Sequence, residues 1–310
     1  MKTRIYTLGK GNSVLRALAV TSSVMIGVVG LSTSASSAAG VHPRASVHSN
    51  APAGSVHNWK NKLGHNTSGW CDGGPTDAPC SGGSGDYGTI DIVSHTYSNS
   101  GGYAPSVPGP GGQSHYARVS GGQDGGTESV NGCSVPGGEN CTGPYTLFGP
   151  KNAGNDTVFP AYGFSTSIKI YLDTAWADAN PGQLIGWDTS LQTKTEAFGE
   201  DQTFDICSSA DGGGGYYITT AFGSGGCTTS ATELTTSGWY TFTQNFTKYG
   251  TEVFDQFTIF NSASVNEFSS TVDCAGVTSS TVGGPLYGWF PDEDVLGLPV
   301  AQSSLTKNAA

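Results

Sequence analysis

Charged side chains are scarce in this sequence, and basic ones are the scarcest. Only 12% of the 310 residues are charged, and 13 lysines and arginines stand against 24 acidic residues, for a net charge of −11. Proteins that follow nucleic-acid phosphates need clustered Lys and Arg, because much of their affinity comes from releasing the counterions of those phosphates. The composition therefore argues against nucleic acid as a partner.

Long apolar runs are also missing. The most apolar stretch, Ala17–Leu31, is interrupted by Thr21, Ser22 and Ser23 and falls short of the roughly 20 apolar residues that a membrane-spanning helix needs. Basic residues precede it and small residues follow it, which is the order of a secretory signal peptide. We expect residues 1–39 to be a cleaved signal peptide, no membrane span to remain after its removal, and the mature protein to be secreted to the extracellular side.

The seven cysteines include no CxxC pair, and no histidine stands at a zinc-like distance from them. All seven follow the expected signal peptide, and an exported chain meets an oxidising environment in which disulfides persist. Neighbouring cysteines form three pairs that each close a short Gly-rich loop, although sequence alone leaves the connectivity open and Cys274 unassigned. The three pairs are Cys71–Cys80, Cys133–Cys141 and Cys207–Cys227.

The residues that are plentiful indicate β-structure. The chain has 47 glycines and 15 prolines, and it is rich in Ser and Thr rather than in helix formers. Apolar residues alternate with polar ones in Phe164–Asp173 and Trp239–Thr247, whereas Thr251–Phe260 is apolar on both faces, as in a central strand. The one helix-like stretch is Thr174–Pro181. A dozen or so short strands without crossover helices favour an antiparallel β-sandwich or barrel.

The chain divides into three parts. After the expected signal peptide, residues 40–86 hold four of the six histidines at irregular spacing and show no steady apolar period. We expect this segment to be a flexible linker rather than a metal-binding tract. Residues 87–310 are enough to bury a full two-sheet core as a single β-sandwich domain.

Five segments carry a family resemblance: FPAYGFSTSIKIYLDTAWA, GWDTS, TTSGWYTFTQNF, EVFDQFTIFNSA and VGGPLYGWFPDEDVLGLPV. Between about Pro144 and Leu305 the chain resembles exported bacterial proteins with a concanavalin A-like lectin/glucanase domain. The resemblance covers about half the chain and implies a jelly roll, which is an all-β sandwich of two antiparallel sheets. Because lectins, glucanases and adhesion modules share this sandwich, the resemblance implies the fold more than the function.

Catalytic carboxylates are not evident. A retaining glycosidase needs two carboxyl groups about 5–5.5 Å apart, and the glucanases of the resembled fold carry ExDxxE on one strand, which this chain lacks. In the strand that contains Glu252 and Asp255, these two acids point to opposite faces. The run Asp292-Glu293-Asp294 is expected to be a solvated turn. An enzyme, either a glycoside hydrolase or a polysaccharide lyase, is therefore the alternative, with Glu252 as its first suspect.

A structural calcium ion is a further expectation. Asp201 and Asp205 stand in an acidic segment that we expect to be a loop, and carboxylates at short loop spacings suit a hard cation. Structural calcium is also frequent among the proteins that the chain resembles. An acidic loop without an ion is the competing interpretation.

Aromatic side chains give carbohydrate binding a physical basis, because the C–H face of a sugar packs on a flat ring while nearby polar groups bond its hydroxyls. The candidates are Tyr171 with Asp173 on the polar face of a strand, Trp176, Trp187, and Trp239 on a Thr-lined face. Core packing competes with this role at each aromatic. We expect a secreted, non-catalytic lectin-like protein for a polysaccharide or cell-surface glycan, and a structural or adhesive surface protein is the third possibility.

Overall fold

The computed structural model describes part of the chain, all of it within one unit, residues 39–310. The expected signal peptide, Cys80 and Cys133 lie outside the described residues. The described residues are 56–71, 88–100, 102–123, 141–148, 158–193, 201–210, 213–222, 227, 232–291 and 293–310.

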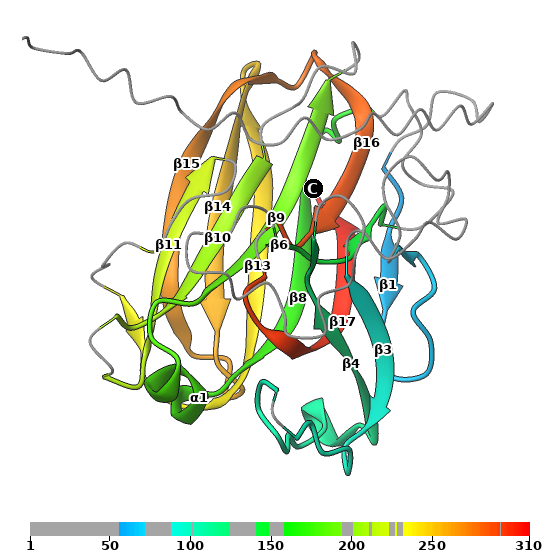
Figure 1. Ribbon diagram of the computed structural model, residues 1–310. Helices are drawn as coiled ribbons and strands as arrows, with labels where there is room; N and C mark the ends of the chain where they lie inside the picture. The colour runs from blue at the N-terminus through cyan, green and yellow to red at the C-terminus, as the bar shows by residue number, and fades with distance from the viewer. Residues whose placement is uncertain are drawn as a thin grey trace, which may run out of the picture. The chain divides into compact units, whose positions relative to one another are not determined.

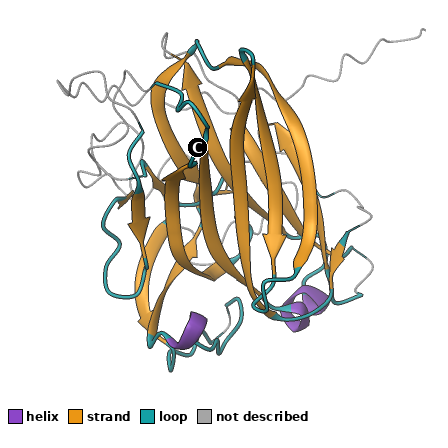
Figure 2. Ribbon diagram, turned by 180° about the vertical axis from the view of Figure 1, so that it is seen from behind, coloured by secondary structure: helices purple, strands orange, loops and turns teal. Residues whose placement is uncertain are grey.

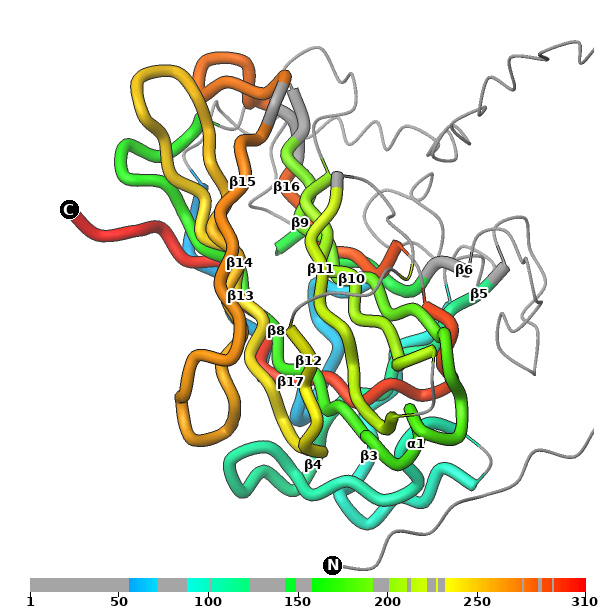
Figure 3. The backbone as a smooth tube through the Cα atoms, turned by 90° about the vertical axis from the view of Figure 1, so that its left-hand side faces the viewer, coloured from blue at the N-terminus to red at the C-terminus, as the bar shows by residue number. Residues whose placement is uncertain are grey.

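The strands of these residues form two large antiparallel sheets that lie as separate layers (Figures 1 and 3). In spatial order, the first sheet contains β15 (Asn266–Thr278), β14 (Glu252–Phe260), β13 (Gly238–Tyr249), β8 (Phe164–Leu172), β17 (Leu296–Lys307), β4 (His115–Ser120) and β3 (Thr89–Ser94), with β1 (Trp59–Asn61) also beside β17. The second sheet contains β12 (Glu233–Leu234), β11 (Tyr216–Phe222), β10 (Asp201–Ser208), β9 (Leu184–Thr193), β16 (Val282–Trp289), β7 (Tyr145–Thr146) and β2 (Trp70–Cys71). The predicted all-β, antiparallel two-sheet sandwich is confirmed.

A two-stranded ribbon, a 3-10 turn and one short helix complete the described secondary structure around these sheets. A small ribbon pairs β5 (Gly122–Gln123) with β6 (Cys141–Thr142), and a 3-10 turn, η1, covers Pro110–Gly112. The helix α1 covers Thr174–Ala179 and ends before Pro181, as the sequence predicts. Figure 2 shows α1 and η1 at the same end of the sandwich.

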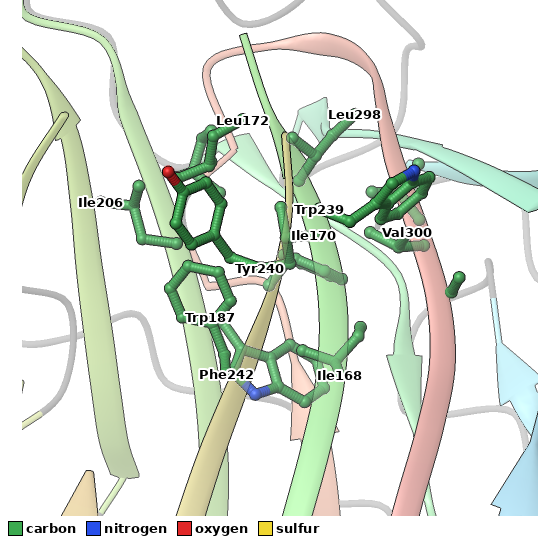
Figure 4. Packing of buried hydrophobic residues seen from close by; sticks show 14 of the residues in the cluster. Ile168, Ile170, Leu172, Trp187, Ile206, Trp239, Tyr240, Phe242, Leu298 and Val300 are labelled. Atoms are coloured by element: carbon green, nitrogen blue, oxygen red, sulfur yellow. The ribbon is translucent and has the colours of Figure 1, made fainter. Parts of the chain in front are cut away.

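The alternation of apolar and polar residues decides which side of the first sheet is buried. Ile168, Ile170 and Leu172 of β8 point inward, and so do Tyr240 and Phe242 of β13. Figure 4 shows these side chains gathered with residues of the second sheet between the two layers. The period-two pattern of both segments therefore predicted the buried face correctly.

Large aromatic side chains join the two sheets. Phe204 of β10 meets Phe242 and Phe257 of the first sheet edge-to-face, with ring centroids 5.2 and 4.7 Å apart. Such pairs contribute about 0.5–1.5 kcal/mol each beyond their buried area. The indole of Trp187 fills the space left by Gly288, where an added Cβ would lie 2.5 Å from the ring.

The segment expected to be a linker belongs in part to the sandwich. The strand β1 pairs with β17, β2 pairs with β7, and both Leu63 and Trp70 are buried. The linker prediction is therefore wrong for residues 56–71, while the rest of residues 40–86 lie outside the described part. Strands of two or three residues are too short to produce an apolar period in the sequence.

Cysteine pairing follows the expected local pattern where the structure describes it. Cys207 at the end of β10 forms a disulfide with Cys227, and Cys71 is also disulfide-bonded. Cys274 is buried in β15. Within the described residues, no helix is long and apolar enough to cross a membrane.

Candidate functional site

The outer face of the first sheet is a polar surface arranged in rows across its strands. Backbone pairing places Tyr171 opposite Trp239, and Lys169 opposite Thr241, which in turn lies opposite Phe260. The next two rows contain only hydroxyl and carboxamide side chains. The first row is Ser167, Thr243 and Thr258, and the second is Ser165, Asn245 and Gln256. Side chains along a strand alternate between faces, so the pattern that buries the core also builds this surface.

The polar groups at one end of this face are already bonded to one another. The Ser165 hydroxyl lies 2.9 Å from the side-chain oxygens of both Asn245 and Asn308, and the hydroxyls of Ser167 and Ser304 lie 2.9 Å apart. Other polar side chains of this face have no hydrogen-bond partner among the described residues, and a ligand can bond to them. These side chains are Lys169, Thr241, Thr243, Gln256 and Thr258.

A pocket of about 360 Å³ opens beside Lys169 and Thr241 on this face. Its walls carry two aromatic rings, an ammonium group, an amide and several hydroxyls. The lining residues are Gly111, Lys169, Trp239, Thr241, Phe260, Asn261, Ser262 and Ser264.

A second pocket of about 200 Å³ adjoins the first. Trp239, Asn261 and Ser262 line both pockets, and we call the two adjoining pockets together the outer groove. The second pocket differs in charge, because Glu233 and Glu267 are the charged residues that line it.

Trp239 is held rigidly in the floor of the outer groove. Its side chain is 8% exposed, and its indole N–H donates to the Pro108 carbonyl at 2.7 Å. Tyr171 and Tyr116 meet the ring edge-to-face, with centroids 5.6 and 5.7 Å away. Burial, with a smaller effect of the Asp173 carboxylate, raises the pKa of Tyr171, so its phenol keeps its proton.

The segment that contains Tyr103 and Ala104, a few residues before Pro108, is held by the buried guanidinium of Arg118. Arg118 donates to the carbonyls of Tyr103 and Ala104 at 2.8 Å each and to that of Gly297 at 2.6 Å. These bonds anchor the segment a few residues before Pro108. Hydrogen bonds from a charged donor are strong, so the chain that leads to Pro108 is held in place.

The loop between β14 and β15, which also lines the outer groove, is held by the side chain of Asn261. The side-chain oxygen of Asn261 accepts from the backbone N–H groups of Ala263 and Val265 at 2.9 and 3.0 Å, and its amide donates to Glu267. An Asn that bonds to the backbone two residues ahead fixes a turn. The loop between β14 and β15 therefore has a set shape before any ligand arrives.

Of the predicted glycan-binding residues, Trp239 lines the outer groove and Tyr171 packs against its ring, whereas the others lie elsewhere. Trp187 is fully buried and packs against Phe290, with centroids 5.0 Å apart, so its predicted contact with a sugar is wrong. Trp176 lies in the half-buried edge of the core against Tyr103, with centroids 4.8 Å apart. Asp173 is the N-cap of α1 and accepts from Ala175 N at 3.0 Å.

The predicted calcium ligands do not fit one ion. Asp201 and Asp205 lie in the strand β10 rather than in a loop. Four residues of strand separate their Cα atoms by about 13 Å, whereas calcium ligands lie 2.3–2.6 Å from the ion. In the described part of the chain, no three His, Cys, Asp or Glu side chains are grouped to hold a metal.

The other acidic candidates are divided between surface and core. Glu252 is exposed at the start of β14 and Asp255 is fully buried on the opposite face, as the alternation predicts. Glu293 was expected in a solvated turn, but it has no exposed surface and pairs with Ile185 in a bridge to β9. That prediction is wrong because the chain after β16 packs back on the second sheet.

Most residues of the outer groove carry no signal in the sequence that indicates a binding site. Asn261, Ser262, Glu233 and Glu267 stand in short polar stretches whose only signal is that of a turn. The Thr-lined face had indicated Trp239, and the structure places this residue in both pockets.

No protein-family model matches the chain, and no curated protein matches it in sequence. Similar solved structures include the CBM2 module of the evolved Dit of Lactobacillus casei BL23 phage J-1, which is 14% identical. That match covers 82% of this chain and 99% of the module, with a TM-score of 0.37. Arcelin-5, a lectin-like defence protein from Phaseolus vulgaris, is 7% identical over 71% of this chain and 93% of its own, with a TM-score of 0.33.

The tail fibre protein gp63.1 of an E. coli phage is a third similar structure. It is 10% identical over 51% of this chain and 16% of its own, with a TM-score of 0.26. Similarity at this level assigns the chain to no family, and its relation to exported concanavalin A-like proteins stays a prediction.

Proposed function

We propose that the protein is a secreted, non-catalytic carbohydrate-binding protein and that the outer groove holds a polysaccharide or cell-surface glycan. The observation that carries the proposal is the combination in one groove of a fixed indole with amide and hydroxyl groups. Trp239 offers an apolar ring for the C–H face of a sugar. Thr241, Asn261, Ser262 and Ser264 stand around it to bond the sugar hydroxyls.

Pre-organisation supports this role. Binding is weakened when side chains and loops must be ordered as the ligand arrives, and rigid sites avoid that cost. Trp239 is fixed through Pro108, and the loop after β14 is fixed through Asn261. The groove is also continuous with unbonded hydroxyls on β13 and β14, which extends the surface along the sheet.

A glycan array with the purified protein tests the proposal. We expect saturable binding to one glycan class, and we expect Trp239→Ala to weaken it about tenfold or more. The control is Tyr249→Ala, because Tyr249 is 83% exposed at the far end of β13 and should leave affinity unchanged. A chelator added to the same array tests calcium dependence.

Because Trp239 is largely buried, Trp239→Ala also removes core contacts, and a second variant is needed to separate lost binding from lost stability. Ser262 is exposed in the loop and lines both pockets, so Ser262→Tyr should block the groove without disturbing the core. Binding that survives both Trp239→Ala and Ser262→Tyr would show that the glycan lies elsewhere. A blank array would overturn the proposal and favour a protein-binding, adhesive role.

One observation favours the enzymatic alternative. Glu233 and Glu267 line the same pocket, and two carboxylates across a sugar are what a glycoside hydrolase needs. In that case Glu267→Gln would abolish release of reducing sugar from a bound polysaccharide, while a non-catalytic protein shows no release in either form. Glu252, exposed at the start of β14, is not among the groove's lining residues.

A further inference from the structure

The two ends of the outer groove carry opposite charge. Among the described residues, Lys169 is the one charged side chain that lines the larger pocket. In the same part of the chain, the charged side chains that line the smaller pocket are Glu233 and Glu267, both acidic. Because the pockets share Trp239, adjoining units of one chain-like ligand would meet the two charges in turn.

The ammonium group of Lys169 is available to a ligand. Lys169 is half-buried on the outer face of β8, between Ala301 and Thr241 in the neighbouring strands. Its side chain has no ion pair or hydrogen bond with any residue in the described ranges. In a protein with a net charge of −11, an ammonium without a counter-ion inside a pocket is a built receptor for an anion.

We propose, building on the carbohydrate-binding function above, that the ligand is an acidic polysaccharide with alternating units. Its anionic unit, bearing a carboxylate or a sulfate ester, occupies the larger pocket and accepts a hydrogen bond from Lys169. The next unit is uncharged or carries an amino-derived group, because Glu233 and Glu267 repel a second anion. Charge-assisted hydrogen bonds are about twice as strong as neutral ones, and like charges in contact exclude wrong partners.

The first experiment compares three polymers by titration with the purified protein. Hyaluronan carries carboxylates on alternate units, its carboxyl-reduced form carries no charge, and keratan sulfate carries sulfate but no carboxylate. We expect at least one of the two anionic polymers to bind about tenfold tighter than the reduced form, and their comparison identifies the anionic group. We expect Lys169→Gln to abolish this preference.

Lys248→Gln is the matched control, because Lys248 is exposed on β13 outside the groove and its loss changes net charge equally. Equal affinity for the anionic and reduced polymers, or equal losses in the two lysine variants, would overturn the inference and leave carbohydrate binding intact. If none of the polymers binds and the glycan array is also blank, the proposed function fails with it.

A second experiment tests the alternation. Polygalacturonate carries a carboxylate on every unit, so we expect it to bind about tenfold more weakly than the preferred alternating polymer. The double variant Glu233→Gln, Glu267→Gln should remove this difference. Equal binding of the two polymers to the unaltered protein would show that the smaller pocket does not select its occupant by charge.

Discussion

Two tryptophans of similar appearance in the sequence have different surroundings in the structure. Trp187 faces the core from β9, whereas Trp239 faces the groove from β13. We expect Trp187→Ala to lower the free energy of unfolding by about 3–5 kcal/mol, because it removes a large buried side chain and leaves a cavity. Denaturant titration measures this loss.

The glycan affinity of Trp187→Ala is measured beside its stability. If Trp187→Ala stays folded at low temperature, its glycan affinity should equal that of the unaltered protein, because the indole has no exposed surface. A variant with unchanged stability and lost binding would contradict the assignment of Trp187 to the core.

Among the secondary-structure elements, long alternating segments were predictable and short ones were not. The segments that became β8 and β13 were predicted with their buried faces, because nine or more alternating residues leave a clear pattern. The helix α1 was predicted from its composition and its proline stop, without a buried face. The strands β1 and β2 were missed, since two or three residues carry no period. The strand β10 was predicted to be a loop because its acidic residues follow a glycine at turn-like spacing, whereas the structure buries nearly all of the strand, Asp205 included.

The helix α1 depends on its N-cap residue, Asp173. At six residues it is too short to be stable alone, and Asp173 satisfies the N–H groups of Ala175 and Trp176 at its start. We expect Asp173→Ala to lower the free energy of unfolding by about 1 kcal/mol. Asp178→Ala, at an exposed position of the same helix, should change it by less than about 0.5 kcal/mol. Equal effects of the two variants in urea titration would rule out the capping role.

On the scale of the whole molecule, the outer groove is a product of topology. Its residues come from η1, β8, β12, β13, β14, β15 and the loop between β14 and β15, which lie as far apart in sequence as Gly111 and Glu267. The sequence predicted which face Trp239 and Tyr171 occupy, because alternation along one strand is local information. The sequence alone does not show which strands are neighbours. The proximity of Lys169, Asn261, Glu233 and Glu267 was therefore not predicted.

Buried carboxyl groups should make the stability of the whole protein depend on pH. Burial raises the pKa of Asp188, Asp255 and Glu293 well above their ordinary values, so the folded protein keeps protons that the unfolded chain releases above about pH 4. The stability that these groups contribute is fully present below their ordinary pKa. It is lost as the pH rises toward the raised values, so the unfolding free energy should fall from pH 4 to pH 8.

The variant Asp255→Asn isolates one of these groups. Asp255 lies in β14, on the face toward the second sheet, and the amide keeps its shape without a proton to lose. One such group changes the unfolding free energy by about 1.4 kcal/mol per pH unit within its window. We therefore expect the variant to be more stable than the unaltered protein at pH 8 and to show a shallower pH slope in urea titrations. A slope that is identical in the two proteins would mean that Asp255 is ionised in the folded state, and its burial would then need a counter-charge.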